Sequence, residues 1–250
     1  MDHTWLMRML KQRIDDKPLL NLINQWLKAR IKEPDGRYHK PDSGTPQGGV
    51  VSPVHLHYAL DLWFEKKIKP TLEGRAMLIR YADDFVVAFQ YHREAREFYD
   101  NLVLRLKQFN LDVAPEKTSL KRFSRFRPGQ QSHFEFLGFR FYWEVDFNGE
   151  PRLRRKTAPK KHKTALQNFY AWIKDNRHRR LDHWMPHLKR KIVGFRNYFA
   201  LPDNSLSVGR IYDHILNSLY IWLNRRSGRK SYTWSGIKEM LRYFGIQSMR

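Results

Sequence analysis

The sequence predicts an α+β domain followed by an all-α, strongly basic domain. Apolar residues recur at helical spacing near the N-terminus and again beyond residue 165. Two apolar runs, 76–81 and 85–89, flank a short polar break and have the pattern of a β-hairpin. Residues 121–250 hold 28 basic and 9 acidic side chains, whereas residues 1–120 hold 19 and 16. The excess positive charge therefore belongs almost entirely to the second half.

The elements of the first half follow from spacing and turn residues. Residues 4–31 are expected to form two helices, with Pro18 near the start of the second. Residues 32–49 are polar and rich in Gly and Pro, which predicts a loop. Further helices are expected over 56–68 and over 92–109, the latter with one apolar face.

The second half begins with a strand-like stretch, Phe134–Val145, that turns at Asn148–Gly149. From residue 165 onward the pattern is helical. Breaks in that pattern are expected at Pro186, Pro202 and Ser227–Gly228. The predicted organisation is a first domain over 1–150, a basic linker over 151–164 and a helical domain over 165–250.

The composition excludes several classes of protein. The 250 residues include no cysteine, which rules out a disulfide scaffold, a cysteine-based metal site and a thiol nucleophile. No apolar run approaches the roughly 18–20 residues that cross a bilayer, and no signal pattern opens the chain. A cytoplasmic protein is expected, bacterial rather than organellar. The net charge of +22, with many aromatic residues, favours a nucleic-acid partner. An anionic membrane surface is the alternative that charge alone leaves open.

Asp83 and Asp84 are the most informative pair. A two-residue hairpin turn prefers Asn-Gly or Asp-Gly, so Asp-Asp is a poor choice on turn grounds. Two adjacent carboxylates repel each other and need a cation or an open, solvated position. A divalent metal bound through carboxylate oxygens would satisfy both, and such carboxylates hold the two Mg²⁺ ions of in-line phosphoryl transfer. On the dipeptide alone, a solvated turn is the simpler interpretation.

Four blocks in the same order carry a family resemblance. Residues 81–84 (Tyr-Ala-Asp-Asp) resemble the palm signature of reverse transcriptases, and residues 44–53 (Gly-Thr-Pro-Gln-Gly-Gly-Val-Val-Ser-Pro) resemble their conserved loop. Residues 115–118 (Pro-Glu-Lys-Thr) and 136–139 (Phe-Leu-Gly-Phe) resemble the next two blocks. The basic C-terminal stretch resembles the maturase-specific thumb, or domain X. Over essentially its whole length, the chain is similar to group II intron-encoded reverse transcriptases and maturases.

The resemblance implies a polymerase palm, with an antiparallel sheet and packed helices, followed by a helical thumb. It implies an RNA-directed DNA polymerase that uses Mg²⁺ and deoxynucleotides on an RNA template with a DNA primer, and that binds group II intron RNA for splicing. No membrane partner is implied. Asp83 would be a metal ligand, Asp84 would support the metal site, and Lys117 would reach the nucleotide phosphates. The nucleotide and template residues would be Thr45, Pro46, Gln47, Gly48, Gly49 and Tyr81. The primer grip would be Phe136, Leu137, Gly138 and Phe139. The RNA-binding residues would be Lys160, Lys161, Lys163, Lys189, Arg190, Lys191, Arg196, Arg225, Arg226, Arg229 and Lys230.

The resemblance also predicts a gap. In the family a further catalytic aspartate lies on an earlier strand, and this chain opens with residues that resemble those just after it. We therefore expect an N-terminally truncated palm without fingers, and a chain that does not polymerise DNA alone. An upstream fragment or a second copy would be the partner. About four residues also look lost after Val54.

Two other functions stay open at this point. One is a non-catalytic RNA-binding maturase remnant that assists intron folding and splicing. The other is a CRISPR-linked or retron-like reverse transcriptase, although the domain X-like tail argues against it. His183 and His187, four residues apart, could share a metal on a helix face, but no glutamate partner of the metalloprotease type accompanies them.

Overall fold

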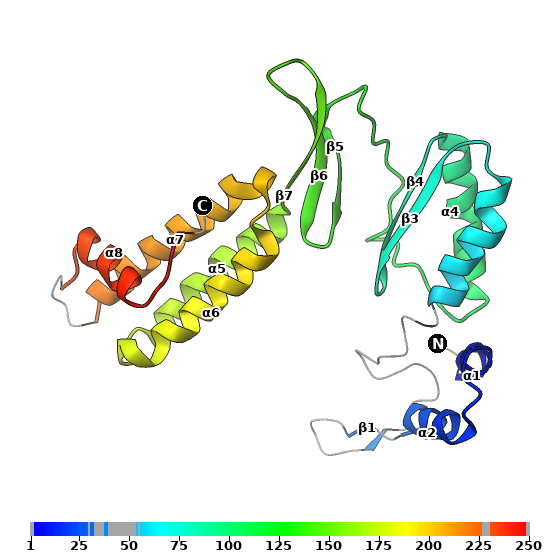
Figure 1. Ribbon diagram of the computed structural model, residues 1–250, viewed down its shortest axis with the longest axis horizontal. Helices are drawn as coiled ribbons and strands as arrows, with labels where there is room; N and C mark the ends of the chain where they lie inside the picture. The colour runs from blue at the N-terminus through cyan, green and yellow to red at the C-terminus, as the bar shows by residue number, and fades with distance from the viewer. Residues whose placement is uncertain are drawn as a thin grey trace. The chain divides into compact units, whose positions relative to one another are not determined.

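The chain divides into two compact units, Met1–Arg122 and Phe123–Arg250 (Figure 1). The computed structural model describes residues 3–29, 31–32, 38–39, 54, 56–226 and 231–248. The unit boundary lies earlier than the 150–160 region that the sequence indicated. No helix in the part that the structure describes is long and apolar enough to span a membrane.

The first unit opens with the two predicted helices, α1 (His3–Lys11) and α2 (Lys17–Leu27). The Asp16 side chain caps α2 by accepting a hydrogen bond from the Leu19 N–H at 2.9 Å. Pro18 sits in the first turn, where no intrahelical N–H is lost. The two helices bury a small apolar cluster around Leu6, Leu10, Leu20 and Leu27.

The segment after α2 contains more structure than the sequence predicted. Two short strands, β1 (Ile31–Lys32) and β2 (Tyr38–His39), pair antiparallel, although Ile31 was expected to end a helix and the residues from Lys32 onward to form a loop. The helix predicted over 56–68 is present, with wide π geometry in η1 (His57–Asp61) and η2 (Phe64–Ile68) and a final 3-10 turn, η3 (Lys69–Thr71). Consecutive π turns are rare and frequently lie at functional sites.

A β-hairpin and a long helix complete the first unit. The hairpin pairs β3 (Ala76–Tyr81) with β4 (Asp84–Phe89), and α4 (His92–Lys107) covers one of its faces (Figure 1). Exposure alternates along β3, as expected for a strand that buries one side. Both predictions, the hairpin and the amphipathic helix, are confirmed. The core of the unit consists of Met9, Ala59, Leu60, Phe64, Phe98, Leu102, Leu106 and Phe109.

The second unit begins with a three-stranded antiparallel sheet in the order β5 (Gly129–Phe136), β6 (Phe139–Val145), β7 (Pro151–Thr157). Two of the sequence predictions are wrong here. The strand expected over 134–145 is two strands, because the chain reverses at residues 137–138. The basic segment 151–164 is not a linker: its first half pairs with β6 from Pro151 to Thr157. The sequence pattern did not reveal this strand because it is rich in Lys and Arg. Their aliphatic stems can pack against a sheet while their charged ends stay in water.

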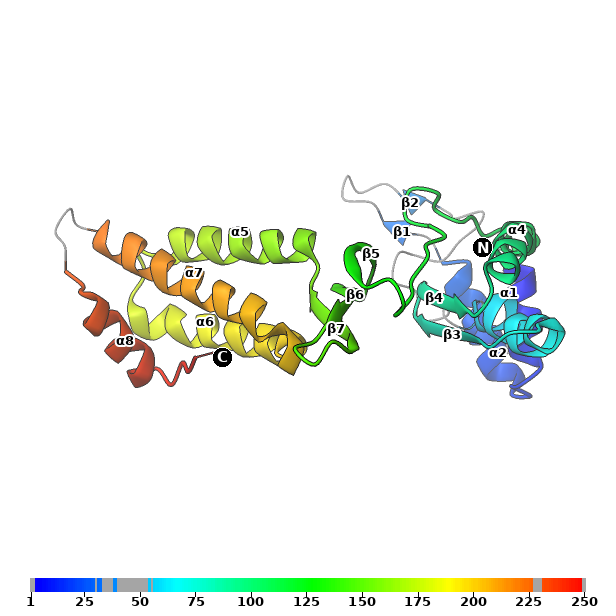
Figure 2. The ribbon, with the colours of Figure 1, turned by 90° about the horizontal axis from the view of Figure 1, so that it is seen from above.

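Helices form the rest of the second unit: α5 (Pro159–Asn176), α6 (Leu181–Phe199), the 3-10 turn η4 (Pro202–Asn204), α7 (Ser205–Asn224) and α8 (Trp234–Tyr243). Figure 2 shows α5, α6 and α7 side by side. Pro186 lies inside α6 and does not end it, so that break was predicted wrongly, whereas α6 does end before Pro202. The helices enclose a large apolar core that includes Trp184, Met185, Leu188, Ile211, Ile215, Leu219 and Ile237.

A buried polar junction joins the sheet to the helices. Asn204 donates to the Thr157 hydroxyl and to the Phe199 carbonyl, both at 2.8 Å, and accepts from the Thr157 N–H at 2.8 Å. Asp203 likewise accepts from the backbone and guanidinium of Arg155. These contacts explain why the sheet belongs to the second unit. The α+β class is confirmed, and the helical part beyond residue 165 shares its unit with a sheet.

Candidate functional site

The paired aspartates lie at the tip of the β3–β4 hairpin. Tyr81 pairs with Asp84, so Ala82 and Asp83 form the two-residue turn. Ala82 has a φ of +54°, a backbone conformation that a residue with a Cβ adopts only at a cost. Asp83, Asp84 and Tyr81 are all exposed. The turn therefore presents two carboxylates to solvent from a strained backbone.

An ion pair braces this turn from inside. The Arg80 guanidinium donates to both oxygens of Asp61 in η1, with Nε–Oδ1 at 2.7 Å and Nη2–Oδ2 at 2.6 Å. Its Nη1 donates to the Ala82 carbonyl oxygen at 2.6 Å. The Arg80 and Asp61 side chains are only 14% and 23% exposed. Bidentate geometry at low exposure makes this a strong and directional contact.

The same contact shifts the pKa values of both partners. Burial alone would raise the pKa of Asp61, but hydrogen bonds from Arg80 and His57 outweigh it and hold that pKa below its ordinary value. The hydrogen bond to Asp61 raises the pKa of Arg80 despite its burial. Both groups therefore stay charged at neutral pH, and the brace persists there.

The outer face of the hairpin is apolar and open. Met77, Ile79 and Tyr81 point away from the core and are 60%, 52% and 67% exposed. Their neighbours Ala76 and Leu78 face the core instead. Large exposed apolar side chains in a row are a feature of many surfaces that contact another molecule.

The two carboxylates suit a divalent cation in type but not in number. Carboxylate oxygens are the ligands that Mg²⁺ prefers. Among the described residues, Asp83 and Asp84 form no ion pair with a basic side chain. The structured part of the chain contains no cluster of three or more His, Cys, Asp or Glu side chains that could hold a metal. The aspartate pair could thus provide part of a metal site.

Lys117 lies in a turn after α4. The Ala114 carbonyl accepts hydrogen bonds from the Lys117 N–H at 3.1 Å and from the Thr118 hydroxyl at 2.9 Å. The Lys117 side chain is exposed and therefore free to reach an anion. The loop predicted to bind nucleotide and template, Thr45 to Gly49, lies outside the described residues.

The predicted primer-grip residues form the β5–β6 turn. Leu137 and Gly138 both have positive φ, +50° and +78°, the geometry of a type I′ hairpin turn. Tyr198 of α6 donates its hydroxyl to the Leu137 carbonyl at 2.9 Å, and its ring stacks on Phe139. This turn belongs to the second unit, whereas the aspartate pair belongs to the first. The helices of the second unit thus hold the turn in place.

The basic residues predicted to bind RNA lie on three elements of the second unit. Three begin α5, four lie along α6 and two follow α7; Arg229 and Lys230 lie outside the described residues. Within the described part of the chain, none of the nine forms an ion pair with a carboxylate. Such uncompensated charge is the electrostatic footprint of a polyanion partner. The nine are Lys160, Lys161, Lys163, Lys189, Arg190, Lys191, Arg196, Arg225 and Arg226.

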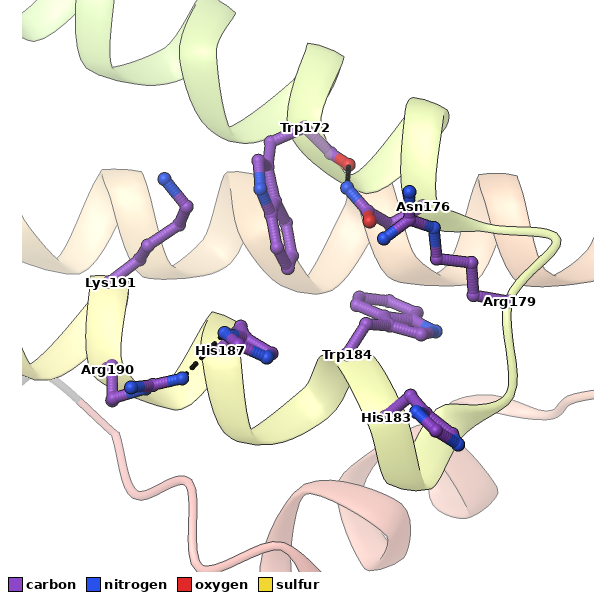
Figure 3. A pocket seen from close by; sticks show the side chains of 8 residues that line it. All are labelled: Trp172, Asn176, Arg179, His183, Trp184, His187, Arg190 and Lys191. Atoms are coloured by element: carbon purple, nitrogen blue, oxygen red, sulfur yellow. Dashed lines mark hydrogen bonds between the residues drawn. The ribbon is translucent and has the colours of Figure 1, made fainter.

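A pocket of about 900 Å³ opens between α5 and α6 (Figure 3). Three of the residues that line it are cations, and none is a carboxylate. Sequence reasoning had assigned Arg190 and Lys191 but missed Arg179 and the pocket itself. It also missed the brace between Asp61 and Arg80. The sequence held one indication of this ion pair: Arg80 is a charged residue at a position of β3 that should face the core, directly before Tyr81. The lining residues are Trp172, Asn176, Arg179, His183, Trp184, His187, Arg190 and Lys191.

Comparison with known proteins identifies the family. A sequence model of the family described as reverse transcriptase (RNA-dependent DNA polymerase) matches residues 1–141, more than half of the chain. This chain belongs to the reverse transcriptase family. The match includes the β3–β4 hairpin with its aspartates and extends across the unit boundary to the β5–β6 turn.

Individual relatives indicate which kind of reverse transcriptase the chain resembles. The COX1/OXI3 intron 1 and intron 2 proteins of Saccharomyces cerevisiae are 30% and 28% identical over 37% and 48% of this chain. The group II intron-encoded protein LtrA of Lactococcus lactis is 42% identical over 22% of it. The resemblance drawn from the sequence blocks is confirmed. The matched parts span only 10–13% of the length of these relatives.

Proposed function

We propose that this chain forms the palm and thumb of an RNA-directed DNA polymerase of the group II intron type, and that it binds intron RNA. One observation carries the catalytic part. A braced hairpin presents Asp83 and Asp84 within the segment that matches the reverse transcriptase family. Template RNA, primer DNA and deoxynucleotides would be its partners.

Each assigned residue has a physical role in this proposal. Asp83 and Asp84 would hold Mg²⁺, which when bound supplies the positive charge that stabilises phosphoryl transfer. Lys117 would neutralise nucleotide phosphates as a point charge. The loop from Thr45 to Gly49 and the exposed Tyr81 ring would border the nucleotide and template. The fixed turn from Phe136 to Phe139 would support the primer.

The aspartate pair also limits what the chain does alone. Two metal ions need more oxygen ligands than two adjacent carboxylates supply. We propose that a further carboxylate comes from another segment or polypeptide, an upstream fragment or a second copy. The purified 250-residue chain is therefore expected not to extend a primer.

RNA binding is the second function, and it does not depend on catalysis. The nine described basic residues without a carboxylate partner favour it. A chain that binds intron RNA without extending a primer would act as a maturase-like factor. A cytoplasmic location in a bacterium stays a prediction, since the relatives come from a yeast and a bacterium.

The test combines primer extension with RNA binding. The purified chain would be incubated with poly(rA)/oligo(dT), Mg²⁺ and dTTP beside Asp83→Asn, which removes one carboxylate charge at similar size. Extension that vanishes in Asp83→Asn would establish the polymerase and refute the missing-ligand proposal. RNA binding without extension would leave the maturase function. Failure to bind structured RNA would overturn the RNA-binding function, and failure to extend the primer even when a polypeptide with the further carboxylate is added would overturn the polymerase.

A further inference from the structure

We propose that the pocket between α5 and α6 binds an unpaired nucleotide of RNA, with the base against Trp172 and the phosphate on Lys191 and Arg190. The proposal rests on the RNA-binding function proposed above and goes further by assigning a specific recognition site. All described parts of this site lie within the second unit.

The charge of the pocket identifies an anion as its ligand. Arg179, Arg190 and Lys191 line the pocket, and no carboxylate lines it with them. Arg190 Nη2 lies 2.6 Å from His187 Nδ1, and because a guanidinium only donates, His187 accepts through this nitrogen. His187 thereby orients Arg190 without neutralising it. A phosphate is the anion that Arg190 and Lys191, adjacent on α6, suit.

The aromatic walls identify the rest of the ligand as a ring. Trp172 points from α5 into the pocket, and Trp184 and His187 project into it from α6 (Figure 3). The Lys191 ammonium lies 5.4 Å from the centre of the Trp172 ring, so cation and ring surface are adjacent. A nucleotide pairs the same two groups, a phosphate and a flat base, at a similar spacing.

Two further wall residues support the Trp172 ring and offer a hydrogen-bond acceptor to a ligand. Trp184 is 2% exposed and packs edge to face against Trp172, with the ring centres 5.7 Å apart, so it supports the Trp172 ring. Asn176 adds an amide whose NH₂ is held by the Trp172 carbonyl at 2.8 Å, which leaves its oxygen to accept.

The shape favours an unpaired nucleotide over a duplex. A hollow of about 900 Å³ lies within the range of ligand-binding clefts and is ample for one nucleotide. A base inside a helix is stacked and paired, and only a base from a loop, bulge or strand end can enter a hollow. Arg226, which donates to the Arg179 carbonyl at 3.2 Å, places a further cation at the rim.

The test compares two RNA hairpins that differ by one bulged adenine. We expect the wild-type chain to bind the bulged hairpin about tenfold more tightly in fluorescence anisotropy, the scale of one base stacked on an aromatic ring. Lys191→Gln and Arg190→Gln should reduce that ratio to nearly one. Arg210→Gln on α7 removes the same charge outside the pocket and should leave the ratio unchanged.

Trp172→Phe provides a second, conservative variant that keeps a smaller ring and should lower the ratio by severalfold. A 2-aminopurine at the bulge should change its fluorescence on binding to the wild type and not to Lys191→Gln. A ratio of one in the wild type, or a ratio that survives both Lys191→Gln and Arg190→Gln, would overturn the pocket proposal. Failure to bind either hairpin would instead overturn the RNA-binding function beneath it.

Discussion

At the scale of single residues, the Arg80–Asp61 pair holds the turn that carries Asp83. One guanidinium uses three N–H groups, two on the Asp61 carboxylate and one on the Ala82 carbonyl. A lysine in its place would offer a point charge without the planar fork. Arg80 is therefore a positioning residue: it contacts the turn and not the reacting atoms.

We expect Arg80→Gln to lower the free energy of unfolding by about 2 kcal/mol, because it leaves the Asp61 carboxylate largely desolvated without its partner. Arg93→Gln is the matched control. Arg93 pairs with Glu73 at 67% and 72% exposure, and surface pairs contribute about 0.5 kcal/mol or less. Urea denaturation followed by circular dichroism would measure both. Equal losses would show that the brace contributes no more than a surface pair.

The lowered pKa of Asp61 predicts how stability depends on pH. Because the folded-state pKa lies below its ordinary value, the carboxylate stabilises the fold at pH values above about 4, and this contribution is lost as pH falls through the folded-state pKa. Asp61→Asn should destabilise the chain at pH 6 and flatten the acid side of its stability profile. Thermal midpoints measured from pH 6 to pH 3 would test this. A mutant whose acid loss matches the wild type in size would contradict it.

At the scale of elements, the two hairpin turns differ in how well their residues fit. The β5–β6 turn has Leu137 at +50° and Gly138 at +78°. A type I′ turn prefers Asn-Gly, so Gly138 suits the second central position of the turn, whereas Leu137 does not suit the first. A Cβ on Gly138 would meet Phe199 only at 3.5 Å, an ordinary contact. The glycine is required by conformation and not by space.

Leu137→Asn should therefore stabilise the second unit by roughly 0.5–1 kcal/mol, since Asn adopts positive φ more readily. Gly138→Ala should destabilise it by about 1 kcal/mol. The hydrogen bond from Tyr198 ends on the Leu137 backbone and survives both changes. Thermal unfolding of the two variants provides the comparison. Shifts of the same sign would refute this account of the turn.

Local patterns predicted the elements that depend on local residues. The β3–β4 hairpin and α4 followed from apolar spacing, and the aspartates were correctly placed at the turn. The β7 strand was missed because its basic side chains conceal a backbone that pairs with β6. Pro186 led to the opposite error, a predicted helix break that is absent, because the packing of α6 in the core outweighs one lost hydrogen bond. Contacts between distant segments decided both cases.

The site shows the same division. Asp83 and Asp84 were assigned from the sequence because residues 81–84 resemble the palm signature of reverse transcriptases, and the structure places them at the hairpin tip. The brace joins residues 19 positions apart, and the pocket joins two helices, so neither has a periodic pattern. Only the fold places Arg179 in the same pocket as Arg190 and Lys191.

At the scale of the whole molecule, we expect the excess positive charge to determine how tightly the chain binds RNA. If the unpaired basic residues contact phosphates, log K for RNA should fall linearly with log salt, by roughly 0.7–0.9 for each contact. Replacing Lys160, Lys161 and Lys163 with Gln should reduce that slope by about 2. The same change at Lys11, Lys17 and Lys28 of the first unit should reduce it less. Anisotropy titrations from 50 to 300 mM KCl measure the slope, and identical slopes in both triple variants would contradict the assignment.

The separate cores of the two units have a thermodynamic consequence. Each unit has a core of its own, so we expect each to unfold in its own cooperative transition with its own free energy of unfolding. A calorimetric scan should resolve into two peaks, and a cavity in one core should move one peak alone. Selection can act on the two units separately in the same way: a lineage can lose the aspartate pair of the first unit and keep the basic residues of the second.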